Sequence, residues 1–383
     1  MKPNLVARGA DRYVVGEAPR YDQRNNAYFR SVWDSELKEL GREYFTVIYP
    51  KDKPGYRLED MSFSQAGWYA EQAFGMGNLG GNKGFYSWES PKIWYSDYRP
   101  PHDIKLDAGD PAKVSRIVKK AAQVYGASLT GICELDHRWL YSYRQNVLEK
   151  KHEPVEIPGE YKYAIVLGFE MDYEVMRHSP SHIGLTAATH GYGRMAFVTG
   201  TLAQFIRYLG YKAIPMGNDT ATSIPLAIDA GLGELSRAGL LITPEYGPRV
   251  RLSKIFTDMP LAVDSPIEFG VWDFCMQCEK CAYLCPGQAI MYGPPTEKIN
   301  NICNREGLLR WPIDAEKCFA FFSRDKTSCG VCVRVCPFNK TPGMLHDTVR
   351  WGVKNTHWLD PLFVKADDLL GYGKRARVER FWE

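Results

Sequence analysis

The sequence lacks the short motifs that identify most nucleotide-dependent and zinc-dependent enzymes. No GxGxxG segment follows a predicted strand, and no phosphate-binding P-loop is present. The chain has eight histidines, and none of them has the HExxH spacing of a zinc hydrolase. No sequence motif therefore indicates a dinucleotide cofactor or a nucleotide-driven reaction. None indicates a histidine-based metal centre either.

Long apolar runs and a strong net charge are missing as well. No stretch of eighteen apolar residues is present, which excludes a segment that spans a bilayer. Residues 1–20 lack the apolar stretch of a secretory signal, so we expect either a cytoplasmic protein or a mature form whose export signal has been removed. The formal net charge of +3 is too small to indicate a nucleic-acid partner, and the basic stretch 373–380 is typical of a solvated end.

Cysteine, by contrast, is abundant, and eight of the ten cysteines lie in two groups. The first group has spacings of two, two and three residues and is followed by a proline, which is typical of a protein that holds a 4Fe–4S cluster. The second group ends in the same way, with Cys336 followed by Pro337. Zinc sites pair two CxxC units and do not need the longer run. The duplication therefore predicts two 4Fe–4S clusters, which together form a short path for electrons.

The order of the cysteines also predicts which of them bind each cluster. In two-cluster ferredoxins, the fourth cysteine of each run binds the other cluster. The first cluster is therefore expected on Cys275, Cys278, Cys281 and Cys336, and the second on Cys285, Cys318, Cys329 and Cys332.

Cys318 has the least regular position among these ligands. Where a regular motif would have a cysteine, the chain has residues 326–328 (KTS), so a loop must bring Cys318 to the cluster. Cys303 is the alternative ligand. Cys318 is preferred because it lies closer in the sequence to the second cysteine run. It also belongs to the apolar stretch CFAFF, which could shield a cluster. The remaining cysteine, Cys133, is expected to be a buried free thiol.

Away from the cysteines, the sequence predicts alternating helices and strands. The clearest helix covers residues 110–126, where Asp110 can cap the first turn, Pro111 suits the turn itself and Gly126 can end the helix. Further helices are predicted over 194–210 and 223–239, and buried strands over 161–171 and 211–217. This alternation predicts an α/β core.

Changes in composition divide the chain into four predicted parts. Residues 1–110 are rich in aromatic and turn residues and indicate an irregular unit that packs over the rest. Residues 111–269 form the α/β core, with an insertion near 141–160. The cysteine-dense segment 270–340 holds the two clusters, and residues 341–383 form a tail that returns to the core.

Several of these stretches resemble one protein family. The two cysteine runs, "KPGYRLEDMSFSQAGWYAE" near the start and "YKAIPMGNDTATSIPLAIDAGLGELSRAGLLITPEYGPRVRLSK" in the middle are similar to the catalytic subunits of corrinoid-dependent reductive dehalogenases, to which epoxyqueuosine reductases are related. The resemblance covers nearly the whole chain. It implies a nitroreductase-like α/β core that binds cobalamin, with an inserted bacterial-ferredoxin-like module for the two clusters. A twin-arginine signal, which family members carry, is missing here.

The family's corrinoid is bound base-off, without a protein histidine below the cobalt, and this sequence agrees because it has no DxHxxG motif. His137, in LDHRWL, has the wrong spacing and is interpreted as structural. The protein backbone is expected to contact the corrin at glycines, because glycine has no side chain that would keep the two apart. The candidate corrin-binding residues are Met216, Gly217, Ser223, Gly231 and Gly233. An alternative for the last two glycines is that they only end a helix or allow tight packing.

The resemblance also implies three catalytic residues. Tyr192 in THGYGRM matches the family's proton-donor tyrosine, and Asn218 in PMGND and Arg251 in YGPRVRLSK match its two polar neighbours. A phenol has a pKa near 10, so a guanidinium beside it would stabilise the anion and ease proton delivery. Arg249 is the alternative arginine.

The activity implied is replacement of halogen by hydrogen in a small organohalide, using electrons from a low-potential donor, as in organohalide respiration. A small membrane-anchor subunit and a location on the outer face of the cytoplasmic membrane are expected with it, with a cytoplasmic location as the alternative. Chlorinated ethenes, chlorinated alkanes and haloaromatics all stay open as substrates. Two alternative functions remain open. One is a tRNA-modifying enzyme like epoxyqueuosine reductase, and the other is a non-catalytic electron-transfer subunit that would hold iron without cobalt.

Overall fold

A four-stranded antiparallel sheet forms the centre of the computed structural model. The structure describes residues 4–5, 8–75, 82–90, 103–147, 149–341 and 343–383. The strands follow the order β2 (Leu129–Glu134), β5 (Tyr163–Glu170), β9 (Val250–Thr257) and β6 (Ala213–Met216). Every neighbouring pair in this sheet is antiparallel. The core therefore mixes helices and strands as predicted, although their alternation along the chain does not produce parallel strands.

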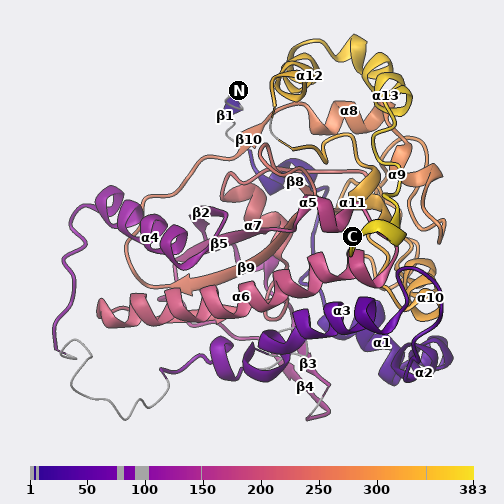
Figure 1. Ribbon diagram of the computed structural model, residues 1–383. Coiled ribbons are helices and arrows are strands. Elements are labelled where there is room, and N and C mark those ends of the chain that lie inside the picture. Colours follow the sequence, from indigo (N-terminus) through magenta and orange to yellow (C-terminus); the bar gives the residue numbers. More distant parts are fainter. Residues whose placement is uncertain (1–3, 6–7, 76–81, 91–102, 148, 342) are drawn as a thin grey trace.

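Helices cover both faces of the sheet, because successive side chains of a strand point to opposite sides. On one face, residues of β5 such as Ile165 pack with side chains of α4 (Pro111–Tyr125) and α6 (His182–Tyr208). On the other face, residues such as Val166 pack with side chains of α7 (Ser223–Asp229). Figure 1 shows α6 extended along the sheet beside β9.

The helix α4 begins and ends where the sequence predicts. The carboxylate of Asp110 accepts a hydrogen bond from the backbone N–H of Lys113 at 2.9 Å, and Pro111 occupies the first turn. Gly126 ends the helix with a positive φ of 114°, a conformation that glycine adopts without strain.

The helix α6 is longer than predicted, since it begins at His182 and not at residue 194. The Ser181 hydroxyl caps it by accepting from the N–H of Gly184 at 3.1 Å. The added turns contain several glycines, which disfavour a helix in isolation. They allow α3 (Leu58–Ala70) to pack closely, because a Cβ atom at Gly193 would lie 3.3 Å from the Ala70 Cβ. Tertiary packing thus outweighs the low helix propensity.

The helix predicted over 223–239 is shorter, since α7 ends at Asp229. The chain turns at Gly231, which has a φ of +71°. It then forms a small hairpin from β7 (Glu234–Leu235) and β8 (Leu241–Ile242).

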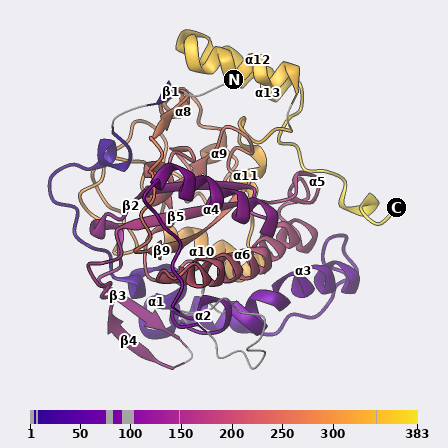
Figure 2. The same cartoon turned by 90° about the vertical axis from the view of Figure 1, so that its left-hand side faces the viewer.

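The N-terminal part contains more helix than the irregular unit that was predicted. It forms α1 (Ala27–Trp33), α2 (Lys38–Phe45) and α3, and α3 packs along α6 (Figures 1 and 2). Part of its aromatic-rich stretch, 91–102, lies outside the described residues. The insertion expected near 141–160 forms a hairpin of β3 (Tyr143–Asn146) and β4 (Lys151–Pro154).

The cysteine-dense segment consists of short helices joined by loops, and the tail after it forms two more helices. The remaining elements are α5 (Tyr173–Met176), α8 (Val271–Gln277), α9 (Lys280–Tyr283), α10 (Ala315–Asp325), α11 (Val331–Val335), α12 (Met344–Asn355) and α13 (Asp360–Leu369), with β1 (Asn4–Leu5) paired to β10 (Ile267–Glu268). The helices α12 and α13 pack against α8 at the top of Figure 1. None of the helices within the described ranges is long and apolar enough to cross a membrane.

Candidate active site and cluster sites

Tyr192 is the centre of the candidate active site. Its hydroxyl oxygen accepts hydrogen bonds from Arg251 Nη1 at 2.9 Å and from Asn218 Nδ2 at 3.1 Å. The Arg251 guanidinium also lies 4.4 Å from the centre of the tyrosine ring, and Trp68 stacks on that ring at 4.8 Å. The phenol donates to no other residue of the described chain, so its proton can be given to a bound molecule. The three residues named from the sequence are thus brought together.

Three separate elements position these side chains. Tyr192 lies in the middle of α6, Arg251 belongs to β9 and pairs with Phe169 of β5, and Asn218 follows β6. Gly191 leaves the space that the arginine needs, because a Cβ atom there would lie 3.0 Å from Arg251 Cγ. A larger residue at this position would push the guanidinium away from the phenol.

The alternative arginine, Arg249, has a different role. It is completely buried, and its Nη1 donates to Glu170 Oε1 at 2.8 Å and to the Met171 carbonyl at 2.7 Å. Its guanidinium is therefore held in an ion pair at the end of β5. Arg251, and not Arg249, is the arginine that contacts Tyr192.

Two residues that sequence reasoning missed hold the loop that carries Asn218. Lys254 is completely buried, and its Nζ donates to the Gly217 carbonyl at 2.6 Å and to Ser223 Oγ at 3.0 Å. Burial lowers the pKa of Lys254 to about 8, and the charge of nearby Asp219 opposes that shift. Asp219 in turn accepts from the Gly217 N–H at 2.9 Å. The sequence carries one sign of this role, because Lys254 is a lone lysine in the otherwise apolar end of a strand, SKIFT.

The candidate corrin-binding residues fall into two groups. Gly217 and Ser223 lie in the loop that Lys254 holds, directly beside Asn218, and Met216 is completely buried in the core at the start of this loop.

Gly231 and Gly233 do not face an open space. A Cβ atom at Gly231 would lie 2.5 Å from the Ser265 carbonyl oxygen, and one at Gly233 would lie 2.0 Å from the Ile242 carbonyl oxygen. Protein backbone therefore occupies the side-chain positions of both glycines, which supports the alternative that they allow tight packing. Their contact with a corrin stays a prediction.

The four cysteines predicted for the first cluster line one cavity. Its wall includes Cys275, Cys278, Cys281 and Cys336, with apolar side chains such as Phe274 and Phe338. Cys332 of the second predicted group also reaches this cavity, so the two groups are neighbours. Within the described ranges, no three His, Cys, Asp or Glu side chains are placed as ligands of a single metal ion. Thiolates on a four-iron cluster each bind a different iron atom, so they surround a cavity and do not meet at one point. The donor set and the cavity both fit such a cluster.

The second predicted group also gathers in space. Burial, and then the nearby thiols of Cys329 and Cys285, raise the pKa of Cys318 to about 12. Burial, and then Cys318 and Cys285, raise the pKa of Cys332 to about 12. The loop before Cys329 turns sharply, with positive φ at Lys326, Ser328 and Cys329 itself. This strained turn brings α10, and with it Cys318, back to the second cysteine run.

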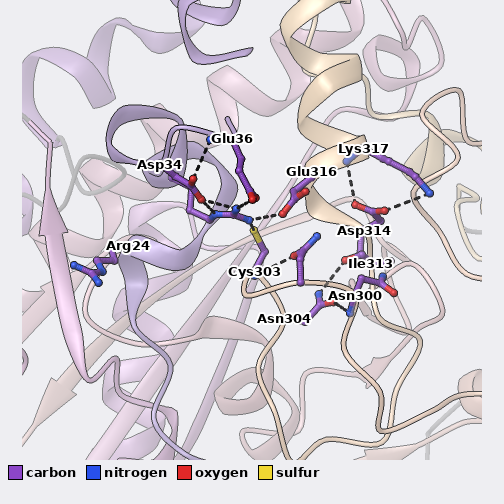
Figure 3. Close-up of polar contacts among 12 residues, drawn as sticks. Arg24, Asp34, Glu36, Asn300, Cys303, Asn304, Ile313, Asp314, Glu316 and Lys317 are labelled. Carbon is purple, nitrogen blue, oxygen red and sulfur yellow. Dashed lines mark hydrogen bonds and ion pairs between the residues drawn. The ribbon is translucent and has the colours of Figure 1, made fainter. Parts of the chain in front are cut away.

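Cys303 lies elsewhere, in a polar network. Its sulfur accepts a hydrogen bond from Arg30 Nη1 at 3.3 Å, and the same guanidinium pairs with Asp34, Glu36 and Glu316. Figure 3 shows Cys303 among these carboxylates, with Glu316 coming from α10. The structure therefore groups Cys318, and not Cys303, with the other cysteines.

Tyr28 links the candidate active site to the second cysteine group. Loss of hydration raises the pKa of its phenol well above the usual value; the charges of Tyr192 and Cys318 add to this shift, and Arg251 opposes it. Nevertheless 38% of the Tyr28 surface is accessible. Tyr28 is thus partly exposed and lies near both Tyr192 and Cys318.

The helix α6 contacts the second cysteine group as well. Ala187 and Ala188 of α6 belong to one buried apolar cluster with Val333 of α11, and Cys332 packs against that cluster. Tyr192 lies about one helical turn further along α6. One continuous helix thus supports both the cluster site and the phenol.

Comparison with known proteins identifies the family. Residues 274–340 match the model of the 4Fe-4S dicluster domain. The chain is 35% identical to the tetrachloroethene reductive dehalogenase of Sulfurospirillum multivorans, over 95% of this chain and 78% of that protein. The chain belongs to the reductive dehalogenase family. A tetrachloroethene reductive dehalogenase of Desulfitobacterium hafniense is 36% identical, over 76% of this chain and 59% of that protein.

Solved structures agree with this assignment. The catabolic reductive dehalogenase NpRdhA, in complex with 3-bromo-4-hydroxybenzoic acid, matches all of this chain with a TM-score of 0.76 and 25% identity, although the chain spans only 50% of that protein. The epoxyqueuosine reductase of Bacillus anthracis matches only 29% of this chain. Reductive dehalogenases are oxidoreductases that carry a corrinoid and two 4Fe–4S clusters, and the matched dicluster domain contains all eight predicted cluster ligands.

Proposed function

We propose that this chain removes halogen reductively from a small apolar organohalide, and that chlorinated ethenes are its substrates. The arrangement around Tyr192 carries the proposal, because a phenol oxygen that accepts from Arg251 and Asn218 keeps its own proton for transfer. Two of the relatives named above are tetrachloroethene reductive dehalogenases. The stacked rings of Trp68 and Tyr192 suit an apolar substrate better than a charged one.

The residues would act as follows. Replacement of a carbon–halogen bond by a carbon–hydrogen bond requires two electrons and one proton. Tyr192 gives the proton to the carbon, and Arg251 and Asn218 stabilise the phenolate that is left. Arginine keeps its charge in a dry pocket, so this stabilisation is present throughout.

The corrinoid would lie next to the phenol of Tyr192, where Asn218 is exposed. Tyr28, which lies near both Tyr192 and Cys318, supports a position between the phenol and the second cysteine group. When bound, the corrinoid would supply a redox-active cobalt that can deliver electrons to the carbon–halogen bond, and the halogen would leave as halide. Gly217 and Ser223 would hold its edge, and the core around them would be nitroreductase-like.

The cluster ligands proposed are those grouped by the structure, with Cys318 completing the second site. Tyr28 lies near both Tyr192 and Cys318, which supports the second site as the inner one, so electrons would enter through the first. Residues 1–110 would cover the active site, and residues 111–269 would bind the corrinoid. Residues 270–340 would form the electron path, and residues 341–383 would form the tail. A low-potential donor, a small membrane-anchor subunit and a location on the outer face of the cytoplasmic membrane belong to the same proposal.

The test is halide release by the loaded protein. The chain is purified without oxygen, supplied with cobalamin, iron and sulfide, and reduced with methyl viologen. We expect chloride from tetrachloroethene and trichloroethene, and little from a chlorinated alkane or a haloaromatic acid. Fully loaded protein that releases no halide from any of these compounds would contradict the proposal.

A further inference from the structure

Arg237 lies directly behind the first cysteine group. The residues on both sides of it, Ser236 and Ala238, line the cavity that is shared by Cys275, Cys278, Cys281 and Cys336. The side chain of Arg237 is completely buried. The turn between β7 and β8, closed by Gly239 with a φ of +66°, places it there.

The guanidinium is bound almost entirely by backbone carbonyls of the first cysteine run and the loop after it. Nη2 donates to the Cys275 carbonyl at 2.7 Å, and Nε donates to the carbonyls of Cys275 and Cys278 at 3.1 Å each. Nη1 donates to the carbonyls of Met291 and Gly293 at 2.9 Å each. The guanidinium also lies 4.9 Å from the centre of the Trp311 ring.

No carboxylate within the described ranges forms a hydrogen bond with Arg237. The nearest is that of Glu279, 3.7 Å from Nη1, and its oxygen already accepts from the Gly293 N–H at 2.6 Å. A buried cation without such a partner exerts its field on whatever lies beside it.

The other cations at this site are balanced. Lys280 pairs with Asp367 at 2.5 Å and with Asp368 at 2.6 Å, and Lys340 pairs with Asp367 at 2.7 Å. These two lysines therefore face two carboxylates. Arg237 is paired only with Glu279 among the described carboxylates, at 3.7 Å and without a hydrogen bond, so its charge is the least compensated of the three cations beside the cavity.

We propose that Arg237 is a positioning residue that raises the reduction potential of the first cluster, so that this cluster accepts electrons from the donor. One electron from a low-potential reductant adds one negative charge to the cluster, and a buried positive charge nearby stabilises the reduced form. The proposal rests on the two-cluster assignment made above and goes beyond it, because it gives this residue a function in electron entry.

Two substitutions separate this function from simple support of the loop. Arg237→Gln removes the charge but keeps donors for some of the carbonyls. Arg305→Gln is the matched control, because Arg305 is also buried, donates only to the carbonyls of Pro19, Ala18 and Arg138, and lies 4.6 Å from the Trp139 ring.

The measurement is a redox titration of the iron-loaded proteins followed by electron paramagnetic resonance. In Arg237→Gln, one of the two cluster potentials should fall by about 59 mV, which is a tenfold change in a one-electron equilibrium. In Arg305→Gln, both potentials should match those of the unaltered chain. Two intact cluster signals with unchanged potentials in Arg237→Gln would overturn the proposal while leaving the two-cluster assignment in place.

A second variant decides the matter if Arg237→Gln does not retain iron. Glu279→Gln keeps an oxygen that can accept from Gly293 but removes the negative charge nearest Arg237. The potential of the same cluster should then rise. An unchanged or lower potential in Glu279→Gln would overturn the proposal. Absence of any second cluster signal in the unaltered chain would instead contradict the proposed function.

Discussion

Replacing Tyr192 by phenylalanine tests the proton donor while changing little else. The substitution removes one oxygen, which accepts at 2.9 Å from Arg251 and at 3.1 Å from Asn218. Both donors are partly accessible, so water can take the place of the lost oxygen. We therefore expect a loss of stability of no more than about 1.5 kcal/mol, the usual contribution of a hydrogen bond.

The effect on catalysis should be much larger. A well-placed general acid contributes a factor of about 10² to 10⁴ in rate. This corresponds to about 3 to 5 kcal/mol in the activation free energy, since each tenfold change is about 1.4 kcal/mol. Here the charged guanidinium beside the phenol stabilises its anion, which places the expected effect of Tyr192→Phe in the upper part of this range.

The assay is chloride release from tetrachloroethene with reduced methyl viologen, with iron and cobalt measured on the same samples. Tyr211→Phe is the control, because Tyr211 is a buried tyrosine whose hydroxyl donates to the Leu106 carbonyl at 2.8 Å, away from Arg251 and Asn218. Tyr211→Phe should keep its activity. If Tyr192→Phe keeps both its cofactors and a rate within about threefold of the unaltered chain, Tyr192 is not the proton donor.

Three further results are expected. Arg251→Lys should lower halide release about tenfold or more at full cofactor content, because an ammonium cannot both lie over the ring and donate in the same geometry. Cys318→Ser should remove up to about four of the eight iron atoms and Cys303→Ser none, as measured by iron analysis; equal losses would contradict the ligand assignment. Burial raises the pKa of Glu234 from 4.5 to about 7, so the folded chain binds this proton more tightly than the unfolded chain. Stability should therefore fall by about 3 kcal/mol from this group as the pH rises from 4.5 through 7, and melting temperatures measured across this range should show a smaller decrease in Glu234→Gln.

The sequence predicted best where local rules decide the structure. The helix from Pro111 to Tyr125 is set by an aspartate cap and a terminal glycine, and the strands β5 and β6 are continuous apolar runs. The start of α6 could not be predicted, because its glycines disfavour an isolated helix and are accommodated by tertiary contacts, such as that of Gly193 with α3. The tight packing at Gly231 and Gly233 could not be distinguished from a cofactor contact in the sequence, since a close approach by protein backbone and one by a cofactor both favour glycine.

The residues of the candidate site were predicted from the family resemblance and not from the spacing or chemistry of the residues alone. Nothing in the spacing of Tyr192, Asn218 and Arg251 indicates that a loop and a strand bring the last two within 3.1 Å of the Tyr192 hydroxyl. Lys254 and Asp219 escaped notice because their function depends on burial, which a sequence does not show directly. The position of Arg237 could not be predicted either, because its hydrogen-bond partners are backbone carbonyls, which every residue has.

The uninterrupted run of α6 from Ala188 to Tyr192 sets a constraint on evolution and engineering. Each residue of a helix advances the direction of its side chains by about 100°. A single residue inserted between these positions would leave Cys332 in contact with the start of the helix but swing the phenol away from β9. The length of this one turn therefore determines whether the phenol and the second cysteine group keep the relative positions that bring protons and electrons to the same substrate.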